Sequence, residues 1–439
     1  MSERLIPPTI STEIANQTFG RYNALCAPTE TDRVRVFQVN SIIDFDPQDP
    51  ETYATGLRKI KEGMSHALVR MDIDFTNACN DDCPPCFARE LRERYPVEIP
   101  YEKAVRLLDD LRHLGCDCVR FTGGGDPLMH PNFVGLVRYS GANFRTVIDT
   151  NGDYLCKPGY SEAIAQSAHR IRFSVDSGDN ETRLVSHRPK DNSHTYDQLI
   201  ANMSRLRRLA DSLKERDSRL LIGASFIYGS QNYLLVGKFL RDMKDIGVDW
   251  VQVKPALIRG KHPDMQGMEE SVLEQIEQIR SKSPDETVMH LPERVSFDPR
   301  REFSRCWTTQ LRGFVLAHSL LSICNLVRNL EVPFAQIGMI GDGEHPVQNL
   351  LFSEQGKHQI GVVQTTAPGA CKYCIDRITQ KILQYMADIL TTNPNTKFQR
   401  AQVIEGNDSQ VGEEDRHVIN ITLNPKNYQS FRSLELVEF

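Results

Sequence analysis

Cysteine is the residue type whose spacing carries the most chemical information in this chain of 439 residues. Seven of the 11 cysteines fall into two groups, Cys79, Cys83 and Cys86 in the first and Cys306, Cys324, Cys371 and Cys374 in the second. The total is odd, and the N-terminal residues show no basic region followed by an apolar run, so no secretory signal is visible. These features argue against a disulfide framework and indicate metal or redox chemistry.

The first group has the spacing CxxxCxxC, and an aromatic residue, Phe87, follows its last cysteine. A loop without helical hydrogen bonds can turn all three sulfurs inward, and thiolate sulfur selects zinc or iron–sulfur clusters. A structural zinc site usually takes four protein ligands in two paired knuckles, and no fourth ligand follows at that spacing. Three cysteines on a [4Fe–4S] cluster would instead leave one iron open to a chelating substrate.

The second group ends in Cys371-Lys-Tyr-Cys374. That pair alone could be a redox pair, a zinc knuckle or an accident of sequence. The four cysteines are the only ones in this part of the chain. Their grouping favours a single tetrathiolate site that holds either a [4Fe–4S] cluster or zinc.

Apolar and amphipathic stretches alternate between residues 66 and 258. Six stretches are typical of strands, at 66–74, 119–125, 145–152, 170–177, 220–229 and 250–258. Apolar residues recur at helical spacing between them, as at Leu199, Met203 and Leu206. This alternation predicts βαβ units and a parallel sheet. The polar motifs gather at the carboxyl ends of the predicted strands, where parallel α/β sheets and barrels bind ligands.

Two of these motifs complete a pattern that begins with the cysteines. Gly123-Gly124-Gly125-Asp126-Pro127 ends the second predicted strand, and Ser174-Val175-Asp176-Ser177 ends the fourth. Glycines at a strand end let the backbone approach a ligand closely, and Asp126 offers an acceptor for an ammonium group. A dinucleotide site is not indicated, because no GxGxxG opens the helix after the first strand. With the CxxxCxxC-aromatic motif, these segments make residues 66–260 resemble the radical S-adenosylmethionine (SAM) superfamily. That superfamily more often has Glu where this chain has Asp126.

The resemblance implies an α/β fold with a partial (β/α)6 TIM-like barrel. It also implies that Cys79, Cys83 and Cys86 hold a [4Fe–4S] cluster whose fourth iron binds the amine and carboxylate of SAM. The residues expected to contact SAM are Phe87, Gly123, Gly124, Gly125, Asp126, Pro127, Ser174 and Asp176. Reduction of the cluster by a flavodoxin or ferredoxin would cleave SAM to methionine and a 5′-deoxyadenosyl radical, which abstracts hydrogen from an unactivated C–H bond.

The second cysteine group is similar to the twitch subdomain of radical SAM enzymes, which is related to the SPASM group and carries an auxiliary cluster. This resemblance implies an auxiliary [4Fe–4S] cluster on Cys306, Cys324, Cys371 and Cys374. Relatives with one such cluster include a dehydrogenase of an aminocyclitol antibiotic pathway. We therefore expect dehydrogenation of a sugar, aminocyclitol or nucleoside in natural-product biosynthesis. The alternatives are epimerisation or elimination on such a substrate, or maturation of a ribosomally made peptide.

Composition sets the remaining expectations. The formal charge is −6, from 52 basic and 58 acidic residues, which argues against nucleic acid or a membrane surface as a partner. The most apolar stretch, 313–324, is too short to span a bilayer, so we expect a cytoplasmic protein. We predict four parts: an N-terminal cap (1–65), the barrel (66–295), a twitch-like domain (296–390) and a polar C-terminal tail (391–439).

Several other residues attract weaker hypotheses. Cys156 follows the third strand and could donate a hydrogen atom to a substrate radical, although an inert loop thiol is the favoured interpretation. Cys116 and Cys118 are expected to be packing residues. Four polar candidates are expected to be solvated surface groups: His130, Arg183, His187 and Arg188. Two others, Lys254 and Arg259, follow the sixth predicted strand and are expected to line the rim of the site.

Overall fold

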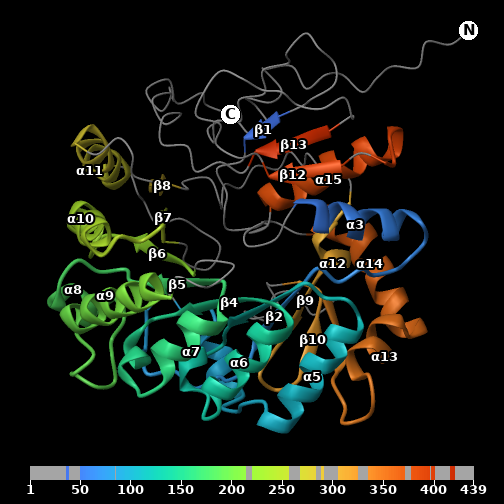
Figure 1. Ribbon diagram of the computed structural model, residues 1–439, viewed down its shortest axis with the longest axis horizontal. Helices are drawn as coiled ribbons and strands as arrows, with labels where there is room; N and C mark the ends of the chain where they lie inside the picture. The colour runs from blue at the N-terminus through green and yellow to red at the C-terminus, as the bar shows by residue number, and fades with distance from the viewer. Residues whose placement is uncertain are drawn as a thin grey trace, which may run out of the picture.

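A computed structural model gives the fold of the chain (Figure 1). The residues that it describes are 36–38, 50–84, 86–213, 220–256, 267–282, 288–290, 305–324, 335–370, 377–395, 397–400 and 416–420. Among them, no helix is both long and apolar enough to cross a membrane.

The centre of the fold is a ten-stranded sheet in the order β11-β10-β9-β2-β3-β4-β5-β6-β7-β8. Eight neighbouring strands, from β9 to β8 in that order, are parallel. Their bounds are β2 Arg70–Asp74, β3 Cys118–Thr122, β4 Arg145–Thr150, β5 Arg170–Ser174, β6 Leu221–Tyr228, β7 Trp250–Pro255, β8 Val288–His290 and β9 Arg312–Val315. The remaining two, β10 Leu320–Ser322 and β11 Gln336–Met339, pair in antiparallel fashion beside β9.

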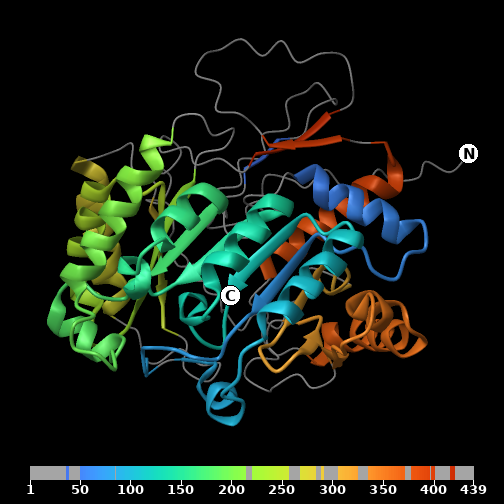
Figure 2. The same cartoon turned by 60° about the horizontal axis from the view of Figure 1, so that its bottom comes forward.

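The six predicted strands correspond to β2–β7, and helices follow them in the expected alternation. These helices lie along one face of the curved sheet (Figure 2). Their bounds are α5 Tyr101–His113, α6 Phe133–Asn143, α7 Tyr160–Ser167, α8 Asn180–Ser186, α9 Tyr196–Ser212, α10 Val236–Ile246 and α11 Met268–Lys282. The prediction of a partial TIM-like barrel with a small additional C-terminal region is confirmed.

The side chains of each strand alternate between the helices and the inner face of the sheet. On β2, Met71 and Ile73 pack in the hydrophobic core with the helices, whereas Arg70 and Asp72 point to the other face. On β3, the pattern places Arg120 on that same inner face. The core therefore lies between sheet and helices, while the inner face of the barrel is charged.

Local sequence explains where the helices begin and end. The side chain of Asp179 accepts a hydrogen bond from the Thr182 amide and caps α8. Thr195 does the same for α9 through the Gln198 amide. Helix α10 ends at Gly247, whose φ of 75° lies in the left-handed region that favours glycine. Short helices cover the strand ends: α4 Arg89–Arg94, η2 Pro127–Met129, η3 Asp153–Cys156 and η4 Tyr233–Leu235.

The chain after residue 300 returns to the first strand of the barrel, which the sequence pattern did not predict. Strand β9 pairs in parallel with β2, with Arg312 opposite Arg70 and Val315 opposite Ile73. The short helix α12 Thr308–Leu311 leads directly into β9. The helices α13 Pro346–Phe352, α14 Glu354–Ala370 and α15 Arg377–Thr392 follow. As a result, the region that carries the second cysteine group adjoins the strand that leads to the first.

Two further elements lie in the parts predicted as cap and tail. Helix α3 Pro50–Lys61 packs beside α12 and α15 (Figure 1). A separate three-stranded sheet joins β1 Val36–Gln38, β13 Arg416–Asn420 and β12 Lys397–Arg400 in that order. Strands near the two ends of the described part of the chain are thus paired, and the four predicted domain boundaries stay predictions.

Candidate active site

The loop that carries the first cysteine group leaves the carboxyl end of β2 and is held there by the glycine segment 123–125. The amide of Gly125 donates to the Thr76 carbonyl at 3.0 Å, and the Asp126 amide donates to the Ala78 carbonyl at 2.9 Å. A Cβ atom on Gly125 would lie 2.0 Å from the carbonyl oxygen of Ala78. The backbone contact requires glycine at this position, because no side chain fits between the two segments.

Two arginines of α4 hold the other end of the loop. Arg89 donates to the carbonyl oxygens of Asp82 (3.0 Å) and Cys83 (2.8 Å), and Arg92 donates to that of Asp81 (3.3 Å). The amide of Cys86 also donates to the Cys83 carbonyl at 3.2 Å. The cysteine loop is therefore bound on both sides by contacts that do not involve the sulfur atoms.

The three thiols are half-buried, and all three interact electrostatically with the guanidinium of Arg92. Burial lowers the pKa of Arg92, but the attraction of Cys86, Cys79 and Cys83 outweighs it, so this pKa is raised. Burial raises the pKa values of the Cys79 and Cys86 thiols. Binding to a metal would convert them to thiolates. Three thiols around one positive charge fit the three-cysteine side of a [4Fe–4S] cluster, with Arg92 offsetting the added negative charge.

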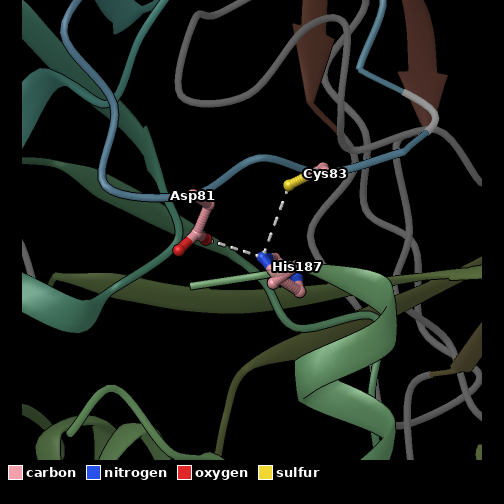
Figure 3. Close-up of side chains that lie close together, drawn as sticks. All are labelled: Asp81, Cys83 and His187. Carbon is pink, nitrogen blue, oxygen red and sulfur yellow. Dashed lines mark hydrogen bonds and ion pairs between the residues drawn. The ribbon is translucent and has the colours of Figure 1, made fainter. Parts of the chain in front are cut away.

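A histidine from a distant helix end lies against this loop. His187 follows α8, and its Nδ1 lies 2.9 Å from Oδ2 of Asp81 and 3.8 Å from Sγ of Cys83 (Figure 3). Its Nε2 faces Asp176 Oδ2 at 3.8 Å. Burial lowers the pKa of His187. The neighbouring Cys83 and the hydrogen bond to Asp81 raise this pKa by more than burial lowers it, so the net shift is well upward. The backbone is joined as well, because the Asp82 amide donates to the His187 carbonyl at 3.0 Å.

A buried polar network that sequence reasoning missed connects this loop to the end of β4. Asn80 donates to Asp153 Oδ2 at 2.7 Å, and Asn151 donates to Asn80 Oδ1 at 2.9 Å and to Asp81 Oδ2 at 3.0 Å. Arg183 closes the network with a salt bridge to Asp153 Oδ1 at 2.5 Å. The available signal was the clustering of Asn and Asp immediately after two predicted strands, in the segments 80–82 and 151–153.

Asp126 lies at the predicted site but binds mainly to the protein. Its carboxylate accepts hydrogen bonds from the amides of Leu128 (2.9 Å) and Asn151 (2.7 Å) and from the hydroxyl of Thr150 (2.8 Å). Burial raises the pKa of this carboxyl to about 6, against the opposing effect of these hydrogen bonds. Asp126 therefore joins the ends of β3 and β4, and the buried Pro127 continues from it into η2. Its contact with the SAM ammonium group stays a prediction.

The other predicted SAM contacts surround the same end of the sheet. Ser174 is the last residue of β5. Asp176, two residues further on, has a φ of 46°, an uncommon backbone conformation for a residue other than glycine. Its Oδ1 accepts a hydrogen bond from the Ile227 amide at 2.6 Å, which ties it to β6. Phe87 is 59% exposed beside the last cysteine. The predicted contacts of Ser174, Asp176 and Phe87 with SAM stay predictions.

The prediction that His130, Arg183 and His187 are solvated was wrong, because all three are buried. His130 Nε2 donates to the Ile99 carbonyl at 2.9 Å, and its Nδ1 accepts from the Asn132 amide. Arg183 and His187 each have a buried aspartate partner, as described above. Arg188 is exposed, Lys254 is half-buried near Gln252, and Arg259 lies outside the described residues.

The cysteines outside the two groups differ in burial. Cys116 and Cys118 are buried, which confirms the prediction that they pack in the interior. Cys156 is exposed at the end of η3, and its thiol donates to the Asp153 carbonyl at 3.4 Å. This places Cys156 three residues from the polar network at the carboxyl end of β4, and its role as a hydrogen-atom donor stays a prediction.

The second cysteine group is described in part. Cys306 precedes α12 and Cys324 follows β10, and both are half-buried against the core. Gln380 of α15 donates to the Cys306 sulfur at 2.9 Å. Cys371 and Cys374 lie outside the described residues. The described half of the group thus flanks the β9–β10 pair, which continues the sheet from β2.

Comparison with known protein families gives a match over the region that carries the first site. Residues 73–214 match the family described as the radical SAM superfamily. This part of the chain is similar to a radical SAM domain. The match covers the cysteine loop, the glycine segment and the ends of β3, β4 and β5. Such a domain works with a [4Fe–4S] cluster and SAM, and the donor set described above fits that cluster.

Two curated relatives share part of the sequence. One is an AdoMet-dependent heme synthase of Oleidesulfovibrio alaskensis, 30% identical over 124 residues, which are 28% of this chain and 32% of that protein. The other is a tungsten-containing aldehyde ferredoxin oxidoreductase cofactor-modifying protein of Pyrococcus furiosus. It is 23% identical over 190 residues, or 42% of this chain and 51% of that protein. The matched region thus spans about a third and about half of these relatives.

Among solved structures, the fold is similar to that of SuiB from Streptococcus suis bound to S-adenosylmethionine. The TM-score is 0.50 with 13% sequence identity, and the alignment covers 69% of this chain and 68% of SuiB. SuiB bound to its precursor peptide SuiA gives the same TM-score of 0.50 with 14% identity, covering 69% of each chain. Identities this low support a common fold and say nothing about a common substrate.

Proposed function

We propose that this chain is a radical SAM enzyme that removes hydrogen from a polar small molecule, a sugar, aminocyclitol or nucleoside, in a dehydrogenation of natural-product biosynthesis. The observation that carries the proposal is the attachment of the cysteine loop to the glycine segment 123–125. This attachment brings Cys79, Cys83 and Cys86 to the end of the sheet at which Ser174 and Asp176 lie.

The chain's own residues hold and shield this site. When bound, the cluster and SAM supply a 5′-deoxyadenosyl radical that abstracts hydrogen from a C–H bond. Arg89 and Arg92 fix the loop backbone, and the buried pair of Asp81 and His187 holds the end of α8 against it. A rigid, largely buried surround of this kind excludes water, which protects a reactive radical from quenching.

The charged inner face of the barrel supports a polar substrate. Asp72 binds Arg70 at 2.7 Å and lies 3.5 Å from Arg120. Asp149 binds both Arg120 and Arg172, the latter at 2.8 Å. All of them except Arg70 form a row across β2, β3, β4 and β5, two positions before the ends of β2, β3 and β5. An apolar substrate would gain little from such a surface, whereas hydroxyl, amino or phosphate groups can hydrogen-bond to it.

The second cysteine group supports the choice of dehydrogenation. Oxidation of a carbinol to a ketone removes one hydrogen atom, one proton and one further electron. We propose that Cys306, Cys324, Cys371 and Cys374 hold an auxiliary [4Fe–4S] cluster that supplies the acceptor for that electron. Four cysteines would complete the cluster's ligands, which suits electron transfer better than direct binding of substrate. A flavodoxin or ferredoxin is the proposed reducing partner of the first cluster.

The named relatives carry out different reactions, so they do not choose among substrates. Epimerisation or elimination on the same polar substrates is the first alternative. Maturation of a peptide is the second, since SuiB with the same fold is bound to a precursor peptide. The charged inner face favours the small polar molecule over an extended peptide, because its aspartates and arginines pair across the width of four strands.

A single assay separates dehydrogenation from epimerisation. The reconstituted, dithionite-reduced protein is incubated with SAM and a panel of sugars, aminocyclitols and nucleosides in deuterated water, and the products are analysed by mass spectrometry. We expect a product two hydrogens lighter than its substrate, equimolar 5′-deoxyadenosine, and no solvent deuterium on carbon. We also expect Cys156→Ala to retain most of the turnover. Carbon-bound deuterium in the product, with loss of product in Cys156→Ala, would establish epimerisation and overturn dehydrogenation.

A further inference from the structure

His187 places a hydrogen-bond donor beside a cysteine of the first group. Its Nδ1 atom lies 2.9 Å from Oδ2 of Asp81 and 3.8 Å from Sγ of Cys83, and Figure 3 shows the ring edge between these two side chains. A carboxylate oxygen can only accept a hydrogen bond, so Nδ1 carries the hydrogen. The edge of the ring that faces the sulfur is therefore an N–H edge.

Two asparagines fix the carboxylate that orients this imidazole. Asn151 donates to Oδ2 of Asp81 at 3.0 Å, and Asn80 donates to Oδ1 at 3.1 Å. Asp81 is buried, so its position depends on these contacts and not on solvent. A carboxylate behind a histidine is the arrangement that sets the tautomer and the ring orientation of histidines at metal sites. Here the atom in front of the ring is the sulfur of an expected metal ligand.

The backbone that carries His187 is also fixed to the cysteine loop. The Asp82 amide donates to the His187 carbonyl at 3.0 Å, and the Lys190 amide donates to the Asn80 carbonyl at 2.9 Å. Between these two contacts, Arg188 has a φ of 49°, an uncommon conformation for a residue other than glycine. None of these contacts uses a sulfur atom, so none is lost when the cysteines bind iron.

An N–H group beside a cysteine ligand has a known chemical effect on an iron–sulfur cluster. Hydrogen bonds to the sulfurs are among the factors that set its reduction potential. A cluster gains negative charge when it is reduced, so a hydrogen bond to one of its thiolates stabilises the reduced form more than the oxidised form. The ring of His187 is buried, and water therefore weakens this interaction little.

We propose that His187 is a positioning residue that acts through Cys83: its Nδ1–H group hydrogen-bonds to the Cys83 sulfur and makes the first cluster easier to reduce. The proposal rests on the proposed cluster at Cys79, Cys83 and Cys86, but it does not depend on the substrate or on an auxiliary cluster. A purely structural role, in which the ring only ties the end of α8 to Asp81, would leave the reduction potential unchanged.

Two amide substitutions at position 187 test which edge of the ring matters. Asparagine can place an N–H group where Nδ1 lies, whereas the longer glutamine places its amide nearer to Nε2, which faces Asp176 at 3.8 Å. The EPR signal of the cluster that responds to SAM is followed in full-length reconstituted protein while the potential is lowered. We expect His187→Asn to keep the midpoint potential of the wild type. In His187→Gln, the ratio of reduced to oxidised cluster at that potential should fall about fivefold, the order of one hydrogen bond.

His194→Asn is the matched control and should also keep the midpoint potential of the wild type. His194 belongs to the same polar network, with its Nδ1 3.3 Å from Asn80 Nδ2 and 3.7 Å from Asp153 Oδ2. Among the described residues, its hydrogen-bond partners include no sulfur atom.

The outcomes separate this proposal from the proposed function. Equal midpoint potentials in the wild type and His187→Gln, with the iron of the first cluster retained, would overturn the role of His187 alone. Equal shifts in His187→Gln and His187→Asn, or loss of this iron from both, would overturn it as well. Loss of the iron from His187→Gln alone would support it, because the same N–H group would then be needed to keep the cluster. A wild type without a SAM-responsive cluster would overturn the proposed function and this inference together.

Discussion

The guanidinium of Arg183 lies 2.5 Å from the Asp153 carboxylate, and neither side chain has appreciable contact with solvent. Arg183 belongs to α8, which follows β5, whereas Asp153 begins η3 after β4. The pair thus joins the ends of two neighbouring strands directly behind the cysteine loop. Asn80 of that loop donates to the other oxygen of the same carboxylate. The pair therefore supports the position of the loop.

Replacement of Arg183 by Met should lower the free energy of unfolding by about 3–5 kcal/mol, because it leaves Asp153 buried without its counter-ion. Chemical denaturation at pH 7.5 measures the change. Arg205→Met is the matched control, since Arg205 is half-exposed and binds Glu162 at 3.1 Å. The control should lose less than about 1 kcal/mol. Equal losses in the two variants would show that the buried pair has no special role.

The neutral imidazole of His66 predicts a pH dependence of stability. Burial lowers its pKa to about 3 in the folded protein, below the ordinary value of 6.5, so the unfolded chain binds a proton first as the pH falls. The contribution of His66 to the free energy of unfolding is therefore fully present above pH 6.5, and it is lost progressively as the pH falls below that value. Between pH 7.5 and 5.5 the wild type should lose about 1.4 kcal/mol from this residue. Denaturation midpoints of wild type and His66→Leu at both pH values test this, and an equal slope in the two proteins would refute it.

Gly125→Ala should disturb the first cluster site without removing any ligand. The added Cβ would meet the Ala78 carbonyl at 2.0 Å and push the cysteine loop away from β3. We expect most of the iron of the first cluster to be lost after reconstitution. Gly341→Ala is the control, because a Cβ there has no neighbour within 4 Å. The effect is measured by iron analysis and by the absorbance at about 400 nm that is typical of iron–sulfur clusters. Full iron in Gly125→Ala would contradict the proposed packing.

Iron content also tests the second cysteine group. The reconstituted wild type should bind about eight irons in two [4Fe–4S] clusters. Replacement of Cys306, Cys324, Cys371 and Cys374 together by Ala should halve this number. Replacement of Cys116 and Cys118, which are buried at the amino end of β3, should leave it unchanged. If the fourfold variant keeps all its iron and loses zinc instead, the auxiliary iron–sulfur cluster is excluded.

The sequence predicted local patterns well and distant pairings poorly. Strands β2–β7 were predictable because parallel strands are buried and regularly separated by amphipathic helices. Strand β9 was missed because it is four residues long and its partner β2 lies more than 200 residues earlier. Arg183 and His187 were expected in solvent because residue type alone does not reveal the buried aspartates that neutralise them. The cysteine and glycine motifs were visible because their spacing is local.

The central claim is that Cys79, Cys83 and Cys86 form a cluster site at which SAM is cleaved. The most direct test measures 5′-deoxyadenosine formed by the reconstituted, dithionite-reduced protein with SAM, in the wild type and in Cys83→Ala. Two thiolates cannot hold a cluster that normally has three protein ligands. The wild type should form 5′-deoxyadenosine slowly even without substrate, and Cys83→Ala should form none. Cleavage that persists in Cys83→Ala would contradict the account.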